Sequence, residues 1–168
     1  MRPVKGDCSE YYQSYIDLIK SDDIIRELDE NNKYATEILN SFPQSKGNFR
    51  YAEGKWTIKE VVGHIMDTER VFAYRALSIA RGEKKQLPGF DQDQYVAHGN
   101  FNDRPLFELT YEYRLLREST ILLFKSFDKS VLQNRGNANG NDVTVLALMF
   151  ITAGHEKHHL NVLKERYI

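Results

Sequence analysis

The segment 57-TIKEVVGHIMDTERVFAYRALSIARG-82 has the pattern of a long amphipathic helix. It opens with Thr57 and Glu60, which stand at the spacing of a capping box: each side chain can accept a hydrogen bond from the backbone N–H of the other residue. Gly82 stands where a helix commonly ends on glycine. Between these signals the apolar residues recur at helical spacing: Ile58, Val61, Val62, Ile65, Phe72 and Ala76. The segment therefore predicts a helix to about Arg81 with one buried face.

Three more segments predict long helices, at about 22–42, 105–127 and 143–165, and a short one is expected at about 9–20. Pro43 ends the first, and Pro105 opens the second. That second segment places packing residues at alternating steps of three and four: Leu106, Leu109, Tyr113, Leu116, Thr120, Leu123 and Phe127. No stretch alternates apolar and polar residues between hairpin turns, and the polar stretch 134–142 is expected to be a turn. The sequence predicts an all-α four-helix bundle forming a single domain over 1–168.

The connection at 82–104 is long, and its Pro-Gly pair and Asp and Asn residues argue against a regular element. It contains Asp91, Asp93, Tyr95 and His98. One interpretation is an ordered connection that only caps the bundle. The other is a lid that closes over a functional site and contacts the substrate.

Composition excludes several classes of function. The 168 residues carry 23 basic and 24 acidic side chains, a formal net charge of -1, so no basic patch for nucleic acid or an anionic membrane is expected. No apolar run approaches the roughly 20 residues that span a bilayer. The single cysteine, Cys8, cannot form an intramolecular disulfide, and the first residues do not resemble a signal peptide. These features predict a soluble cytoplasmic protein that acts on a small molecule.

The run 154-GHEKHHL-160 contains three of the five histidines. At helical spacing His155 and His159 lie one turn apart on the apolar face, and His158 lies near its boundary. The opposite side, expected to face solvent, carries Glu156, Lys157, Asn161 and Lys164. Two inward histidines are either hydrogen-bonded core residues or half of a metal site, because an unsatisfied buried imidazole is costly.

His64 borders the apolar face of the 57–81 helix, so it is either a half-exposed residue or a third metal ligand beside His155 and His159. Asp67 is a solvated residue or a partner for a bound water. Glu69 falls inside the apolar face and needs a partner.

That partner is either a ligating imidazole or an arginine such as Arg75, Arg81 or Arg114. The aromatic residues near the N-terminus are expected to pack in the core rather than stack on substrate: Tyr11, Tyr12 and Tyr15.

Four segments resemble the DinB family, which includes the YfiT-like proteins and thiol-dependent S-transferases: 55-KWTIKEVVGHIMDTERVFAYR-75, 88-PGFDQDQYV-96, 103-DRPLFELTYEYRLLRES-119 and 154-GHEKHHLNVL-163. The resemblance implies an up-down-down-up bundle with a long crossover between the second and third helices. It also implies a metal held by His64, His155 and His159, leaving His158 near the site or at a dimer surface. Members of the family are often dimers, so a homodimer is expected.

Three imidazole ligands leave an open coordination position, which is typical of a catalytic metal. Zn²⁺ and Ni²⁺ both suit imidazole, and either can activate water or a low-molecular-weight thiol. The first hypothesis is therefore a metal-dependent hydrolase or thiol S-transferase. The alternative is a non-catalytic bundle, metal-binding or purely structural, that acts through a protein partner. Metal or stress sensing is a weaker third option.

Overall fold

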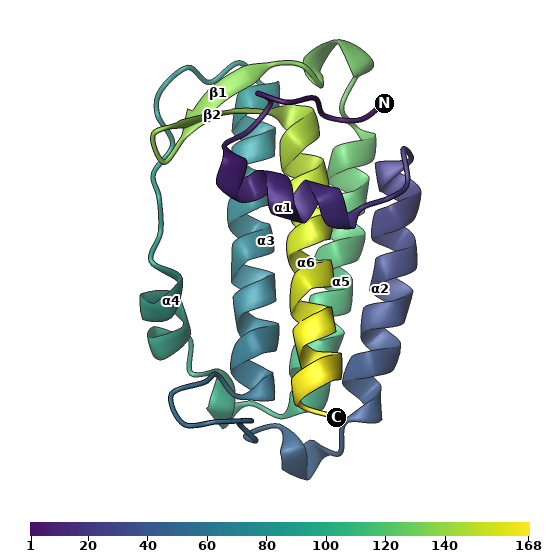
Figure 1. The fold of residues 1–168 in the computed structure, drawn as a ribbon, viewed down its shortest axis with the longest axis vertical. Coiled ribbons are helices and arrows are strands. Elements are labelled where there is room, and N and C mark those ends of the chain that lie inside the picture. Colours follow the sequence, from purple (N-terminus) through teal and green to yellow (C-terminus); the bar gives the residue numbers. More distant parts are fainter.

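The structure, a computed structural model, describes residues 1–168. Its four long helices are α2 (Ile24–Ser41), α3 (Ile58–Ala80), α5 (Leu106–Lys125) and α6 (Val145–Arg166). α2 and α6 run in one direction and α3 and α5 in the other, so α3 and α5 are parallel (Figure 1). α3 packs against α5 and α6, and α2 packs against the same two helices. The predicted up-down-down-up four-helix bundle is confirmed.

α3 begins and ends where its sequence signals stand. Thr57 Oγ1 accepts the Glu60 N–H at 3.0 Å, and the Glu60 carboxylate accepts the Thr57 N–H at 2.7 Å. Gly82 follows the helix at a φ of +91°, a left-handed conformation that glycine adopts without strain. This capping box sets the start of α3, and with it the height of His64 in the bundle.

The short helix α1 (Glu10–Leu18) crosses α6 on the outside of the bundle (Figure 1). The two helices come together at Gly154, where a Cβ atom would collide with the backbone carbonyl oxygen of Tyr15. Glycine at this position therefore lets α1 lie directly over the turn of α6 that carries His155.

The crossover from Gly82 to Pro105 returns along the side of the bundle (Figure 1). The expectation that it lacks regular structure is wrong, because it contains α4 (Gln92–His98) and a 3₁₀ turn at Phe101–Asp103. Asp91 caps α4 by accepting the N–H groups of Asp93 and Gln94, and Val96 buries one side. A helix of seven residues is too short to show a clear apolar period in the sequence.

The 134–142 stretch is not a simple turn either. It forms an antiparallel hairpin of β1 (Arg135–Ala138) and β2 (Asn141–Thr144), with Arg135 opposite Thr144. Asn139 and Gly140 both have positive φ, as a two-residue hairpin turn of this kind requires. The hairpin also pairs with the crossover, because Leu87 donates its N–H to Asn137 and accepts that of Asn139.

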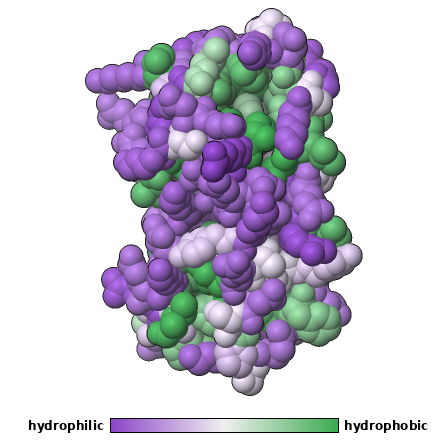
Figure 2. All heavy atoms as spheres, turned by 90° about the vertical axis from the view of Figure 1, so that its right-hand side faces the viewer, coloured by the Kyte–Doolittle hydropathy of each residue, from purple (hydrophilic) through white to green (hydrophobic).

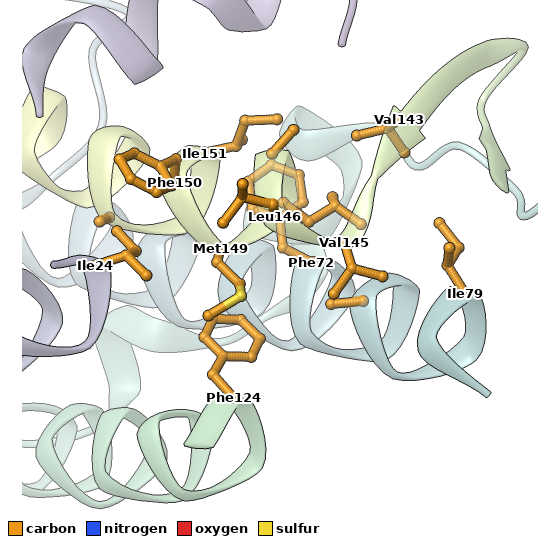
Figure 3. Close-up of a cluster of buried hydrophobic side chains, with 14 of the residues drawn as sticks. Ile24, Phe72, Ile79, Phe124, Val143, Val145, Leu146, Met149, Phe150 and Ile151 are labelled. Atoms are coloured by element: carbon orange, nitrogen blue, oxygen red, sulfur yellow. The ribbon is translucent and has the colours of Figure 1, made fainter. Parts of the chain in front are cut away.

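Two apolar clusters fill the bundle, one toward each end. One surrounds the start of α6, where Met149 points toward Phe124 of α5 (Figure 3). The other surrounds the start of α3 and the end of α6. Between them lies a layer of buried polar side chains from all four helices: Asn31, Asn32, Glu69, Arg117, His155 and Glu156. His155 therefore lies in the polar layer that separates the two apolar clusters.

The outer surface toward α2 is largely hydrophilic, with hydrophobic side chains gathered near its upper end (Figure 2). None of the helices has the length and apolar character needed to cross a membrane.

Candidate metal centre

The structure brings three histidines from two helices to one point. His64 lies in the second turn of α3, and His155 and His159 lie on successive turns of α6. Their Nε2 atoms form a nearly equilateral triangle. The Nε2 atom of His64 lies 3.0 Å from that of His155 and 3.1 Å from that of His159, and the Nε2 atoms of His155 and His159 are 3.1 Å apart. These are the three residues that the sequence analysis selected as candidate ligands.

All three imidazoles favour the neutral form. Burial is the main cause, and it lowers the pKa of His64 to about 4 and that of His159 to about 3. Burial also places the pKa of His155 well below its usual range, and the neighbouring histidines lower it further. At neutral pH each ring therefore keeps a nitrogen lone pair that can bind a metal.

Three neutral Nε2 atoms at this distance cannot all satisfy one another. Each carries either a proton or a lone pair, so at least one of the three contacts brings two like groups together. A divalent cation that accepts all three lone pairs removes this conflict, and an all-imidazole set suits zinc, nickel or copper. The donor set therefore fits a bound divalent metal.

Aromatic rings enclose the histidine triangle. The Trp56 ring lies 4.7 Å from that of His64, and the Phe72 and Tyr15 rings lie 5.8 and 5.5 Å from that of His155. Such walls limit the access of water and hold the imidazoles in place. Neither Trp56 nor Phe72 was predicted to belong to the site, because neither residue type signals a metal neighbour.

Glu69 is held by Arg117 of α5. The guanidinium donates Nε and Nη2 to the two carboxylate oxygens at 2.9 and 2.8 Å, and Nη1 to Glu156 at 2.6 Å. The expected partners Arg75, Arg81 and Arg114 were wrong. Arg117 stands four residues after Tyr113 and three before Thr120 on the buried face of α5, and this spacing was the signal that could have identified it.

Glu156 was expected to face solvent and is instead fully buried. α6 is covered by α1 as well as by the other bundle helices, so almost its whole circumference is buried over this turn. Burial, followed by the charge of Glu69, raises the pKa of the Glu156 carboxyl well above its usual value. Arg117 thus joins one carboxylate of α3 to one carboxyl group of α6, the two helices that carry the histidines.

The other candidates lie outside the triangle. Asp67 is half-buried and pairs with Arg70, and burial raises the pKa of its carboxyl group. His158 is exposed, although its ring contacts those of His159 and Tyr15. His98 is exposed in α4 and its Nδ1 lies 2.8 Å from the Gln94 carbonyl oxygen. Asp67, His158 and His98 are therefore not part of the cluster of Nε2 atoms.

Two cavities border the triangle on different sides. The larger, of about 300 Å³, reaches His159 and is lined by polar and aromatic groups that include Lys55, Trp56, Asp93 and His158. The smaller, of about 180 Å³, reaches His155 and is lined mainly by rings: Tyr11, Tyr12, Tyr15, Phe72 and Phe90. The first turn of α4 and the residues before it contribute to both cavities.

Tyr12 and Tyr15 also pack on the core as expected, but Tyr11 is exposed.

The comparisons with known proteins agree with this architecture. The chain is 25% identical over 130 residues to a protein of Oceanobacillus iheyensis named "Putative metal-dependent hydrolase OB0413", an alignment that covers 76% of this chain and 74% of that protein.

Two solved structures share the fold over most of the chain. YfiT from Bacillus subtilis, described as "a probable metal-dependent hydrolase with an unusual four-helix bundle topology", superposes with a TM-score of 0.71 at 15% identity, covering 98% of this chain and 90% of YfiT. The mycothiol-dependent maleylpyruvate isomerase superposes with a TM-score of 0.70 at 9% identity. That alignment covers 87% of this chain but only 61% of the isomerase.

A family model described as the DinB superfamily matches residues 27–163. This span contains the four bundle helices except for the first turn of α2 and the last turn of α6. It also contains the three clustered histidines. The chain therefore belongs to the DinB superfamily.

Proposed function

We propose that this protein is a metal-dependent enzyme that holds a divalent ion, zinc or nickel, on His64, His155 and His159. When bound there, such an ion would activate water or a low-molecular-weight thiol for attack on a small molecule. One observation carries the proposal: three buried imidazoles that favour the neutral form converge with their Nε2 atoms 3.0–3.1 Å apart. The names of the relative from Oceanobacillus and of YfiT support a metal-dependent hydrolase.

The protein would supply a rigid frame for this ion. Arg117 joins Glu69 of α3 to Glu156 of α6, and so fixes the two ligand-bearing helices relative to each other. When bound, the ion would supply the Lewis acidity that lowers the pKa of water or a thiol. The aromatic walls keep bulk water away from the reacting groups.

The two cavities provide room for two reactants. In a thiol transfer, the thiol would lose its proton to solvent and its sulfur would bond to an electrophilic carbon, whose leaving group departs with the bonding electrons. Hydrolysis follows the same course with a water oxygen as the attacking atom. Separate spaces beside His159 and His155 favour a reaction between two bound molecules, as the name of the mycothiol-dependent isomerase also suggests.

Elemental analysis by mass spectrometry tests the metal site directly. Protein purified without an affinity tag is expected to contain about one equivalent of zinc or nickel per chain, and the His155→Ala/His159→Ala variant is expected to contain almost none. His98→Ala is the matched control, because His98 is exposed and outside the cluster. Wild-type protein that takes up neither ion after incubation with both would refute the proposal.

The alternative is a non-catalytic bundle that acts through a protein partner, and His64→Ala separates the two. If the fold survives while metal and turnover of thiol or hydrolysable substrates disappear together, the enzyme is supported. If the variant loses much of its thermal stability and the wild type turns over no such substrate, the structural role is supported.

We also infer that the protein is a homodimer that pairs through α5. This helix exposes Phe107, Tyr111 and Leu122 on one side. In an antiparallel pairing of two α5 helices, Arg114 of each chain would face Glu118 of the other, so the surface is complementary to itself in charge. Analytical ultracentrifugation is expected to give a dimer for the wild type and a monomer for Tyr111→Asp. Tyr74→Asp, at an exposed tyrosine of α3, is the control.

A further inference from the structure

Aromatic rings from α1, α3 and the crossover form most of the wall of the smaller cavity, together with Thr68, Gln92 and His155. Tyr12 meets Phe72 edge-to-face with ring centroids 5.9 Å apart, and Phe72 meets His155 in the same way at 5.8 Å. Tyr15 meets His155 edge-to-face on another side at 5.5 Å. The aromatic walls thus lead to the imidazole of one candidate ligand, so a molecule in this cavity would lie beside the proposed metal.

The volume of the cavity limits what it can hold. It measures about 180 Å³, and an apolar protein cavity of about 150 Å³ is known to accept benzene. One six-membered ring therefore fits in this space. Aromatic walls favour a flat ring, because ring edges and faces attract one another.

Charge selects against a cationic ring, which an aromatic enclosure would otherwise favour. Arg75 is almost fully buried, forms no ion pair with a carboxylate, and lies behind Tyr12 and Phe72. Its Nη2 atom donates to the Pro88 carbonyl oxygen, and its Nε atom has no partner. Together with a divalent ion held at His155, this guanidinium would make the cavity positive. A neutral or anionic ring is therefore preferred.

The larger cavity differs in chemistry. Lys55, Asp93 and His158 line it together with Trp56, and its volume is about 300 Å³. Such a space suits a larger polar molecule such as a thiol cosubstrate. The two spaces are thus matched to different reactants.

We propose that the substrate carries one uncharged or anionic six-membered ring, and that this ring binds among Tyr11, Tyr12, Tyr15, Phe72 and Phe90 with the reacting atom toward His155. The inference rests on the proposed function, which it deepens by naming the substrate class. α1 and the crossover then act as specificity elements, since they supply four of these five rings.

Binding of a small probe tests the cavity without any assay of activity. The probe is 4-fluorobenzyl alcohol, followed by its fluorine NMR signal as protein is added, with zinc-loaded and metal-free protein. A dissociation constant of about a millimolar is expected for so small a ligand. Tyr11→Ala and Phe90→Ala are each expected to weaken binding about fivefold, a typical effect of losing one aromatic contact. Tyr74→Ala, an equally exposed tyrosine outside both cavities, should leave it unchanged.

Related compounds test size and charge. 1-Naphthalenemethanol and benzylamine are expected to bind more weakly than the probe, and benzoate at least as well. The emission of Trp56, which lines the other cavity, should stay constant as the probe is added. Any of four outcomes would overturn the inference. The probe does not bind, or it binds equally weakly to Tyr11→Ala and Tyr74→Ala. Alternatively, benzylamine or the two-ring compound binds more tightly than the probe, or the emission of Trp56 changes. Ring binding in metal-free protein reports on the cavity alone, whereas the metal content reports on the proposed function, so the two failures are distinguishable.

Discussion

The indole of Trp56 lies against the imidazole of His64, with ring centroids 4.7 Å apart and planes tilted by 42°. Trp56 is the only tryptophan in the chain, so its fluorescence reports on this one place. Nothing else in the molecule couples a spectroscopic signal so directly to a candidate metal ligand.

Metal binding should therefore be visible in tryptophan emission. Ni²⁺ or Co²⁺, with partly filled d shells, is expected to quench Trp56 strongly at one equivalent, whereas Zn²⁺ with its filled shell changes it little. A fluorescence titration of metal-free protein measures the effect. The His155→Ala/His159→Ala variant should show no saturable quenching, and an equal response in that variant would place the metal elsewhere.

Removal of Arg117 should lower the free energy of unfolding. Arg117→Met would leave Glu69 and Glu156 buried side by side without a cation, and breaking such a pair typically costs about 3–5 kcal/mol of unfolding free energy. Urea denaturation followed by circular dichroism measures it. Arg26→Met, which breaks an exposed pair with Glu30, should lower the stability far less, because solvent screens such a pair.

If Arg117 also positions the ligand-bearing helices, metal affinity should fall in a variant that still folds. The triple variant Arg117→Met/Glu69→Gln/Glu156→Gln removes the unpaired charges and is expected to recover part of the stability. Wild-type metal affinity in that variant would show that the ion pairs serve stability alone.

Gly154→Ala should destabilise the fold although alanine normally favours a helix. In an open helix this change stabilises by roughly 1 kcal/mol. Here the added methyl group would strike the backbone of Tyr15, and overpacking of this kind typically costs about 1–3 kcal/mol. Thermal unfolding measures the sign, and an increase in melting temperature would mean that α1 does not lie against α6 as described.

Acid should destabilise the metal-free protein over a defined range of pH. The pKa values of His64 and His159 in the folded chain are about 4 and about 3, whereas an unfolded histidine has a pKa of about 6.5. Between these values the unfolded chain binds more protons than the folded one, so the free energy of unfolding falls as pH drops from about 6.5 toward 4. Above about pH 7 both states are neutral and these residues add no pH dependence.

Urea denaturation of chelator-treated protein from pH 4 to 8 measures this slope, which approaches about 1.4 kcal/mol per pH unit for each histidine within that range. The His159→Leu variant should show a shallower slope over the same range. An unchanged slope would mean that His159 is protonated as readily in the folded as in the unfolded protein.

The four-helix bundle follows from local signals in the sequence. The capping box at Thr57, the glycine at 82 and the steps of three and four from Leu106 onward are local signals, and the helices begin and end close to them. The pairing of His64 with His155 and His159 could also be proposed in advance, because helical spacing places each on an inward face. The β-hairpin was missed although Asn139 and Gly140 form a strong turn signal, since its strands are only four residues long and do not alternate.

The surroundings of the histidines depend on contacts between segments that are far apart in the chain. Helical spacing places Arg117 on the buried face of α5, but it does not tell which neighbouring helix that face meets, so the pairing with Glu69 came from the tertiary structure. Glu156 looked solvent-facing because the periodicity of α6 does not reveal that α1 lies across it. The two cavities have the same origin. Their walls combine α1, the 51–56 segment, α3, α6 and the crossover, which are distant in sequence and meet only because the bundle brings them together near the three imidazoles.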